Sequence, residues 1–180
     1  MPATVTIRRR TGATGSPTNT DTTSATTRLS NSDSASPGTA NPLQIPASSS
    51  NYSWWASFYL NADTSPAGTI DTVQLYSDGA DSYGTGVTMQ VTTASTYVQA
   101  VGSSTTGTQL LIANYAGISP SPPNDMFGYT SASPLSVAGS ITNPSTGIIS
   151  SFWVQQFTIA STASPGALTA ETFTVTYHET

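Results

Sequence analysis

Residues 171–177, ETFTVTY, alternate threonine with apolar side chains, and this period-two pattern constrains the fold more than any other feature of the sequence. Successive side chains of a β-strand point to opposite faces. Phe173, Val175 and Tyr177 therefore share one face, and the threonines share the other. The pattern predicts a strand that buries one face and leaves a threonine-rich face half exposed.

A second alternating segment, YSWWASFYL at residues 52–60, is apolar on both of its faces. Trp54 and Phe58 lie on one face, and Trp55 and Tyr59 lie on the opposite face. A strand of this composition is typically covered on both sides.

Further short strands follow at intervals of about 10–15 residues, separated by turns rich in proline and glycine. No segment has the period of a helix. We therefore predict an all-β fold, an antiparallel β-sandwich or jelly roll of about eight strands with an extended N-terminal arm. The expected strands are 52–60, 69–76, 86–92, 96–101, 109–113, 135–141, 151–160 and 171–177.

Charge divides the chain at about residue 50. Residues 1–50 carry four arginines and two aspartates, a net charge of +2, and residues 51–180 carry seven carboxylates and no basic residue, a net charge of −7. The sum, +2 − 7 = −5, is the formal net charge of the chain. We therefore predict two parts, a basic arm (1–50) and an acidic sandwich (51–180).

Most of the predicted arm is low in complexity. Residues 11–50 contain few apolar side chains and many turn-forming residues, so they cannot offset the entropy of ordering alone. One interpretation is a flexible leader. The other is an arm that orders on a partner or a neighbouring copy, where TVTI (4–7) and PLQI (42–45) add strands to another sheet.

The basic residues of the arm are its candidate partner-binding groups. Three arginines are too few to hold nucleic acid strongly at physiological salt, and the acidic body repels phosphates, so we expect no nucleic-acid partner. An acidic protein surface offers carboxylates that arginine binds in bidentate geometry. The candidate residues are Arg8, Arg9, Arg10 and Arg28.

Several protein classes are excluded by what the sequence lacks. It contains no cysteine, which excludes disulfides and thiolate metal sites. It has no apolar run of about 18 residues and no apolar segment behind the basic N-terminus, so we expect neither a membrane helix nor a secretory signal. An extracellular type of composition without an export signal is typical of a virus structural protein, which is made in the host cytoplasm and works in the virion.

The sequence offers little for catalysis. Its single histidine, His178, lies beside the last predicted strand, and its only glutamates, Glu171 and Glu179, flank the same strand. With no lysine or cysteine, Schiff-base and thiol nucleophiles are absent. We predict a protein that is not an enzyme and has no catalytic residues, cofactor or resident metal.

One loop raises the question of calcium. Residues 76–87, YSDGADSYGTGV, place Asp78 and Asp81 among three glycines, but the spacing does not match an EF-hand loop. A looser calcium site that adds Asp71 stays open. The favoured interpretation is a connector between two strands, in which the glycines adopt positive φ angles.

Trp55 and Tyr59 are the remaining candidates for partner binding. If Trp54 is in the core, Trp55 points outward or into a second layer, and Tyr59 shares its face. Three interpretations stay open: a face covered by loops or by the arm, an interface with a partner or a second copy, and a platform that stacks against sugars.

Three segments together resemble a family of small structural proteins of tailed bacteriophages, whose genes lie among the head and head–tail genes. The segments are YSDGADSYGTGVTMQV, FGYTSASPLSVAGSITNPSTG and STASPGALTAETFTVTYHET, and the resemblance covers about residues 52–180. It implies a role in the virion, as a capsid decoration (cement) protein or a neck component, and brings no catalytic residues with it.

The sequence and the resemblance together predict a non-enzymatic virion protein at the capsid surface or neck. The first hypothesis is a decoration protein whose arm docks on the major capsid protein and stabilises the head, as a homo-oligomer bound to other virion proteins. The second hypothesis is a neck, tail or head-fibre component, and the third is a glycan-binding adhesion module. No membrane partner is expected.

Overall fold

The computed structural model describes residues 2–101 and 111–180, and they form an all-β protein with two single-turn 3-10 helices. The 3-10 helices are η1 (Ile112–Asn114) and η2 (Met126–Gly128). The strands are β1 (Val5–Thr11), β2 (Thr18–Asp21), β3 (Ser50–Tyr52), β4 (Ala56–Ala62), β5 (Thr69–Tyr76), β6 (Val87–Ala94), β7 (Ile118–Asp125), β8 (Leu135–Val137), β9 (Ile141–Thr142), β10 (Gly147–Ile148), β11 (Phe152–Ala160) and β12 (Thr174–Glu179).

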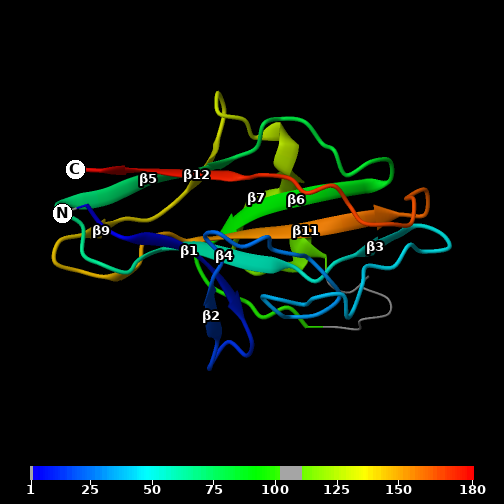
Figure 1. The fold of residues 1–180 in the computed structure, drawn as a ribbon, viewed down its shortest axis with the longest axis horizontal. Helices are drawn as coiled ribbons and strands as arrows, with labels where there is room; N and C mark the ends of the chain where they lie inside the picture. The colour runs from blue at the N-terminus through cyan, green and yellow to red at the C-terminus, as the bar shows by residue number, and fades with distance from the viewer. Residues whose placement is uncertain (1, 102–110) are drawn as a thin grey trace.

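The strands form two antiparallel sheets, which confirms the predicted β-sandwich class (Figure 1). The larger sheet has the order β2-β1-β4-β11-β6-β7, with β10 beside β4 and β3 beside β11. The smaller sheet has the order β12-β5-β8, with β9 also beside β5. The described residues thus contain twelve strands, where the sequence predicted about eight.

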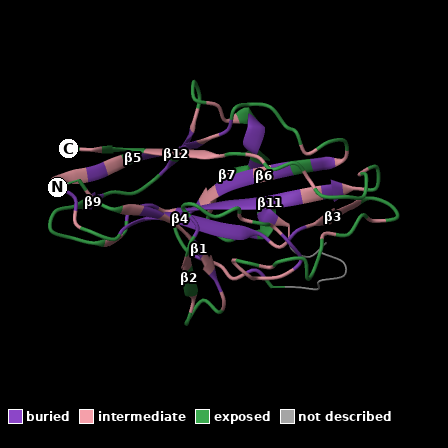
Figure 2. Cartoon of the chain, in the orientation of Figure 1, coloured by how far each residue is buried: buried purple, intermediate pink, exposed green. Residues whose placement is uncertain are grey.

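The main core lies between the two sheets, because the alternating strands present one apolar face to it. Phe58 of β4 and Trp153 of β11 stack with their ring centroids 6.0 Å apart. Leu75 and Val73 of β5 close the core from the smaller sheet, each 1% exposed. Figure 2 shows the buried residues concentrated along β4, β11 and β6, with exposed residues mainly in the connections.

A second buried layer covers the outer face of the larger sheet. Trp55, Tyr59, Phe152 and Val154 point to this side and pack against the segment between β6 and β7. The segment contributes the side chains of Tyr97, Ala100, Ile112 and Tyr115. The central strands β4 and β11 of the larger sheet are therefore buried on both faces, as the sequence of β4 suggested.

One predicted strand is absent, and a second is not formed in its described part. Residues 96–101 adopt no strand, and they cover the outer face instead. Of the predicted strand 109–113, residues 109 and 110 lie outside the described residues, and η1 occupies its end. Conversely β7, with the sequence ISPSPPND, is a strand although its prolines suggested a loop. Proline is tolerated there because β7 lies at the edge of the sheet.

The N-terminal segment differs from the predicted arm, because its first strands belong to the larger sheet. β1 pairs with β4 from Val5↔Ala62 to Arg10↔Ser57, and with β2 on its other side. The division at residue 50 therefore does not separate an extended arm from the sandwich. Residues 22–45, which we call the first strap, contain no strand and run back over the sheet to β3.

Candidate partner-binding surface

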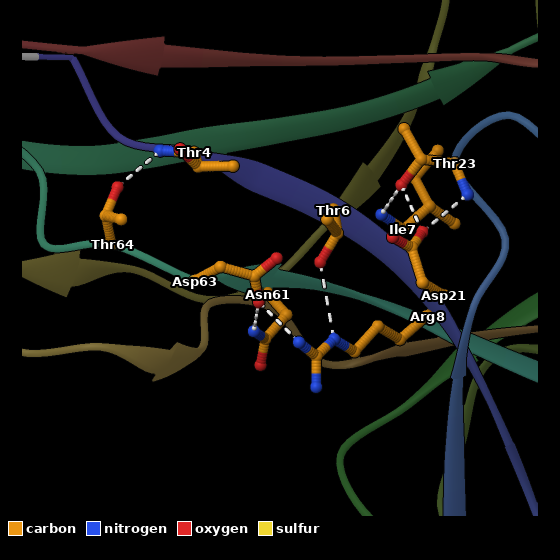
Figure 3. Close-up of polar contacts among 9 residues, drawn as sticks. All are labelled: Thr4, Thr6, Ile7, Arg8, Asp21, Thr23, Asn61, Asp63 and Thr64. Atoms are coloured by element: carbon orange, nitrogen blue, oxygen red, sulfur yellow. Dashed lines mark hydrogen bonds and ion pairs between the residues drawn. The ribbon is translucent and has the colours of Figure 1, made fainter.

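The arginine triplet of β1 is divided between the two faces of the larger sheet. Arg8 forms an ion pair with Asp63, which follows β4, and its Nε donates to Thr6 Oγ1 at 3.3 Å (Figure 3). Asp63 also accepts from Asn61 Nδ2 at 2.7 Å. Arg8 thus ties β1 to the end of β4 and is not free for a partner.

Arg9 points to the opposite face and is 1% exposed. Its guanidinium lies over the ring of Phe58, 5.8 Å from the centroid, and one of its terminal nitrogens donates to the carbonyl of Arg28 at 2.8 Å. Its Nε has no partner among the described residues. Burial lowers the pKa of Arg9 to about 10, and the nearby Asp33 carboxylate opposes this shift.

Arg10 lies on the outer face, above the second buried layer. Its guanidinium is 4.9 Å from the ring centroid of Tyr59 and 5.0 Å from that of Phe152. Its Nε donates to Asn19 Oδ1 of β2 at 2.8 Å. Cation–π contact and hydrogen bonding therefore use this side chain within the fold.

Hydrogen bonds among Ile7, Asp21 and Thr23 hold the hairpin of β1 and β2 together, and Figure 3 also shows them. Thr23 Oγ1 accepts from the backbone N–H of Ile7 at 2.9 Å and donates to Asp21 Oδ1 at 2.7 Å. The hydrogen bonds that Thr23 donates hold the pKa of Asp21 below its usual value. At the start of β1, the N–H of Thr4 donates to Thr64 Oγ1 at 2.7 Å.

Trp55 and Tyr59 are buried, at 6% and 1% exposure, so neither is available to a partner or a sugar ring. Trp55 Nε1 donates to the carbonyl of Val98 at 3.0 Å, and its ring meets Tyr115 edge to face at 5.3 Å. Tyr59 meets Phe152 in the same manner at 5.4 Å. Of the three interpretations open in the sequence, the covered face is the one observed.

The hydroxyl of Tyr115 is the polar centre of this outer layer. It accepts from the N–H of Val98 at 2.7 Å, donates to the carbonyl of Thr96 at 3.1 Å and lies 3.3 Å from Ser57 Oγ. Burial raises the pKa of Tyr115. One phenol therefore fixes residues 96–98, which adopt no strand, onto β4.

The loop between β5 and β6 is a connector. Asp78 Oδ1 accepts from the N–H of Ala80 at 2.9 Å, and Asp81 Oδ1 accepts from the N–H of Tyr83 at 2.9 Å, so both close local turns. Gly86 has φ +79°, and a side chain there would lie 2.6 Å from the backbone nitrogen of Ala163. No group of three potential metal ligands occurs in the described residues.

His178 lies at the free end of the smaller sheet. Its Nδ1 is 3.3 Å from Asp71 Oδ1, and both side chains are well exposed. Thr72 Oγ1 donates to the same carboxylate oxygen at 2.9 Å. Because the histidine and the threonine both contact Asp71 rather than one another, the arrangement does not activate a hydroxyl nucleophile.

Arg28 is the exposed member of the four arginines, and its side chain makes no ion pair or hydrogen bond with the described residues. It lies beside a groove of about 1040 Å³, which we call the strap groove. One wall is the inner face of the larger sheet, with Phe58, Met89 and Trp153. The opposite side is formed by the first strap and by residues 163–173, which we call the second strap.

The strap groove is the feature that the sequence did not predict. In the sequence, the residues of its aromatic wall are typical of the core of a β-sandwich. The residues of its two straps are typical of low-complexity linkers. The weak signal was the presence of isolated leucines, Leu29, Leu43 and Leu168, within those linkers, and all three pack against the main core.

Comparisons with known proteins place this chain in no family: no family model, no curated protein and no solved structure matches it. Among the residues that the structure describes, no helix has the length and apolar character needed to cross a membrane.

Proposed function

We propose that this chain is a non-enzymatic structural protein of a tailed-bacteriophage particle, a decoration protein that binds the major capsid protein and stabilises the head. The observation that carries the proposal is how the polar groups are used. Arg8, Arg9, Arg10 and Tyr115 hold separate segments of the fold together, and the described ionisable groups do not converge on a reactive cleft. Such an arrangement supports a rigid binding body.

The acidic character of the chain supports the same role. Three of its four arginines are occupied within the fold, so carboxylates dominate the charge that remains available, and the formal net charge is −5. A body of this charge avoids nucleic acid inside and outside the head. Its contact with other virion proteins then depends on a protein-binding surface, and not on a basic arm.

The test is the copy number of the chain in purified particles of the phage that encodes it, measured by quantitative mass spectrometry against the major capsid protein. A decoration protein repeats over the capsid lattice, so we expect on the order of hundreds of copies. About a dozen or fewer copies would replace this proposal with a neck, tail or fibre role. Absence from the particle would overturn the virion role altogether.

Release of the protein from purified heads gives a second measurement. Since a ligand that binds only the assembled state stabilises that state, heads without the protein should lose their DNA at a lower temperature. Adding the purified chain back should restore the original temperature. Equal stability with and without the chain would contradict a cement function.

A further inference from the structure

The strand β12 leaves one edge of the smaller sheet unpaired. β12 pairs with β5 on one side only, and no backbone hydrogen bond joins its other side to a described residue. Such an edge presents N–H and C=O groups in the spacing that an additional strand requires. Tyr177, 39% exposed, lies in this strand at the point where its register with β5 shifts.

The other sheet edges are less suited to pairing. β7 contains Pro120, Pro122 and Pro123, which have no amide hydrogen to donate. β2 has four residues and β8 has three, which are too short to hold a partner strand alone. Natural sheets commonly protect their edges by these means. β12 has six residues and no proline, and the register shift between Thr176 and His178 lies in its pairing with β5.

The strap groove adjoins the same edge. It is lined by Val175 of β12, by Phe173 just before it and by Leu75 of the paired strand β5. A strand added to β12 would therefore point every second side chain toward an apolar groove, and backbone pairing would supply the rest of its affinity.

The charged residues that line the groove indicate which charge the added strand should carry. Among the described residues that line the groove, Arg28 is the only cation and Glu171 the only carboxylate. Glu171 already accepts a hydrogen bond from the N–H of Ser82 at 2.7 Å, whereas the side chain of Arg28 has no such partner. The groove is thus matched to a segment that carries a carboxylate of its own.

We propose that the edge of β12 and the strap groove bind an extended segment of a partner protein, with alternating apolar side chains and one carboxylate placed at Arg28. This chain then accepts a strand, whereas the sequence suggested that its N-terminal patches donate strands. The inference deepens the proposed virion function and rests on it for the identity of the partner, but the binding itself is a property of the isolated chain.

The test uses the purified full chain and an mRNA-displayed library of random peptides about ten residues long, enough for one strand. We expect selection to enrich peptides that alternate apolar and polar residues and contain Asp or Glu. The enriched peptides, synthesised singly, should slow amide hydrogen exchange in β12 when they bind.

Two variants and one matched control locate the site. Tyr177→Lys places a charge on the exposed edge strand itself and should weaken peptide binding at least about tenfold. Arg28→Glu should weaken it about fivefold or more, and should weaken carboxylate-free versions of the same peptides less. Ile148→Lys makes the same kind of change at an exposed apolar residue of β10 in the larger sheet, and it should leave affinity unchanged. Circular dichroism confirms that each variant folds.

Three results would overturn the proposal. The first is a selection that enriches no alternating peptide. The second is enriched peptides that bind wild type and Tyr177→Lys equally or protect other strands. The third is a free chain that dimerises through β12 and releases to monomer in Tyr177→Lys, which would make a second copy the occupant. None of these results alters the copy number per particle, so failure of the inference and failure of the proposed function are distinguishable.

Discussion

Arg9 is a charged side chain that lies in the core, although arginine is usually found at the protein surface. It is 1% exposed, has no carboxylate within ion-pair distance among the described residues, and its pKa is lowered to about 10 by burial. Replacing a buried charge by an apolar side chain of similar volume is often neutral or stabilising. We therefore expect Arg9→Met to change the free energy of unfolding by less than about 1 kcal/mol, measured by urea denaturation.

Arg9→Ala is the control for volume, because it removes the same charge and leaves a cavity beside Phe58. It should cost about 2–4 kcal/mol. If Arg9→Met proved as costly as Arg9→Ala, the charge itself would be required, and the explanation by burial would be wrong.

Tyr115 makes the opposite prediction, since its hydroxyl serves three partners. Tyr115→Phe leaves the N–H of Val98 without its acceptor in a buried layer, which should cost about 1–3 kcal/mol of unfolding free energy. Tyr129→Phe is the matched control. The hydroxyl of Tyr129 accepts only an exposed hydrogen bond, from Asn124 Nδ2 at 2.8 Å, so its loss should cost less than about 0.5 kcal/mol. Equal costs would show that Tyr115 does not anchor the outer layer.

At the scale of the element, β1 decides whether the N-terminal segment is an arm or a part of the body. Deleting residues 2–22 removes β1 and β2, exposes the edge of β4 and leaves Asp63 without Arg8. We expect the truncated chain to lose cooperative unfolding and to aggregate, as followed by thermal denaturation and light scattering. A truncated chain that folds and fails only to bind capsids would instead support the predicted docking arm.

The matched control for this deletion lies in the same low-complexity region. The N–H of Asn31 donates to the carbonyl of Asn41 at 3.0 Å, so the ends of the intervening loop already lie together. The control must keep Asp33, because its Oδ2 accepts a hydrogen bond from the N–H of Gly12. A replacement of residues 33–39 by a short glycine-rich turn would remove this contact and is therefore unsuitable. Replacing only residues 35–39 keeps that contact, and this shortening should cost less than about 1 kcal/mol.

Elements with a strong period were predictable, and those defined by distant contacts were not. The alternation of β4, β5 and β11 depends only on which side chains face the core, and the structure confirms these strands. β12 is also present, with Phe173 and Val175 against the core, but Tyr177 was wrongly predicted to share their buried face, because the register shifts at its position and leaves it exposed. β1 was missed as a sheet strand because three consecutive arginines suggest a solvated segment. Burial of Arg9 depends on the first strap, which comes from elsewhere in the sequence. Trp55 and Tyr59 were placed on the correct face, but their cover has no periodic pattern to reveal it.

For the whole molecule, buried phenols make alkaline pH the condition that the fold tolerates least. Burial raises the pKa of Tyr83, Tyr97 and Tyr115, so these groups stay protonated in the folded chain at pH values where the unfolded chain ionises them. Their stabilisation is complete below the ordinary tyrosine pKa of about 10 and is lost as pH rises above it. The lowered pKa of Arg9 has the opposite effect on the free energy of unfolding over part of this pH range. Arg9 is one group, whereas three tyrosines contribute to the decline.

We therefore expect the free energy of unfolding to fall as pH rises above about 10, measured by urea denaturation at a series of pH values. Tyr97→Phe removes one of the contributing phenols and should make the decline shallower. A stability independent of pH between about 9 and 11 would contradict the protonated, buried state of these tyrosines.

The position of β4 in the larger sheet also determines the order in which the chain can assemble as the ribosome makes it. β4 can pair with β1 as soon as it emerges, but its other neighbour, β11, is translated much later, and β5 must likewise wait for β12. Until then, the side chains of Phe58 and Trp55 in the nascent chain lack the residues that pack over them in the folded protein. Pairing over such separations is slow. Newly made chains therefore depend on translation rate and chaperone capacity, and slower synthesis at low temperature should raise the yield of folded protein.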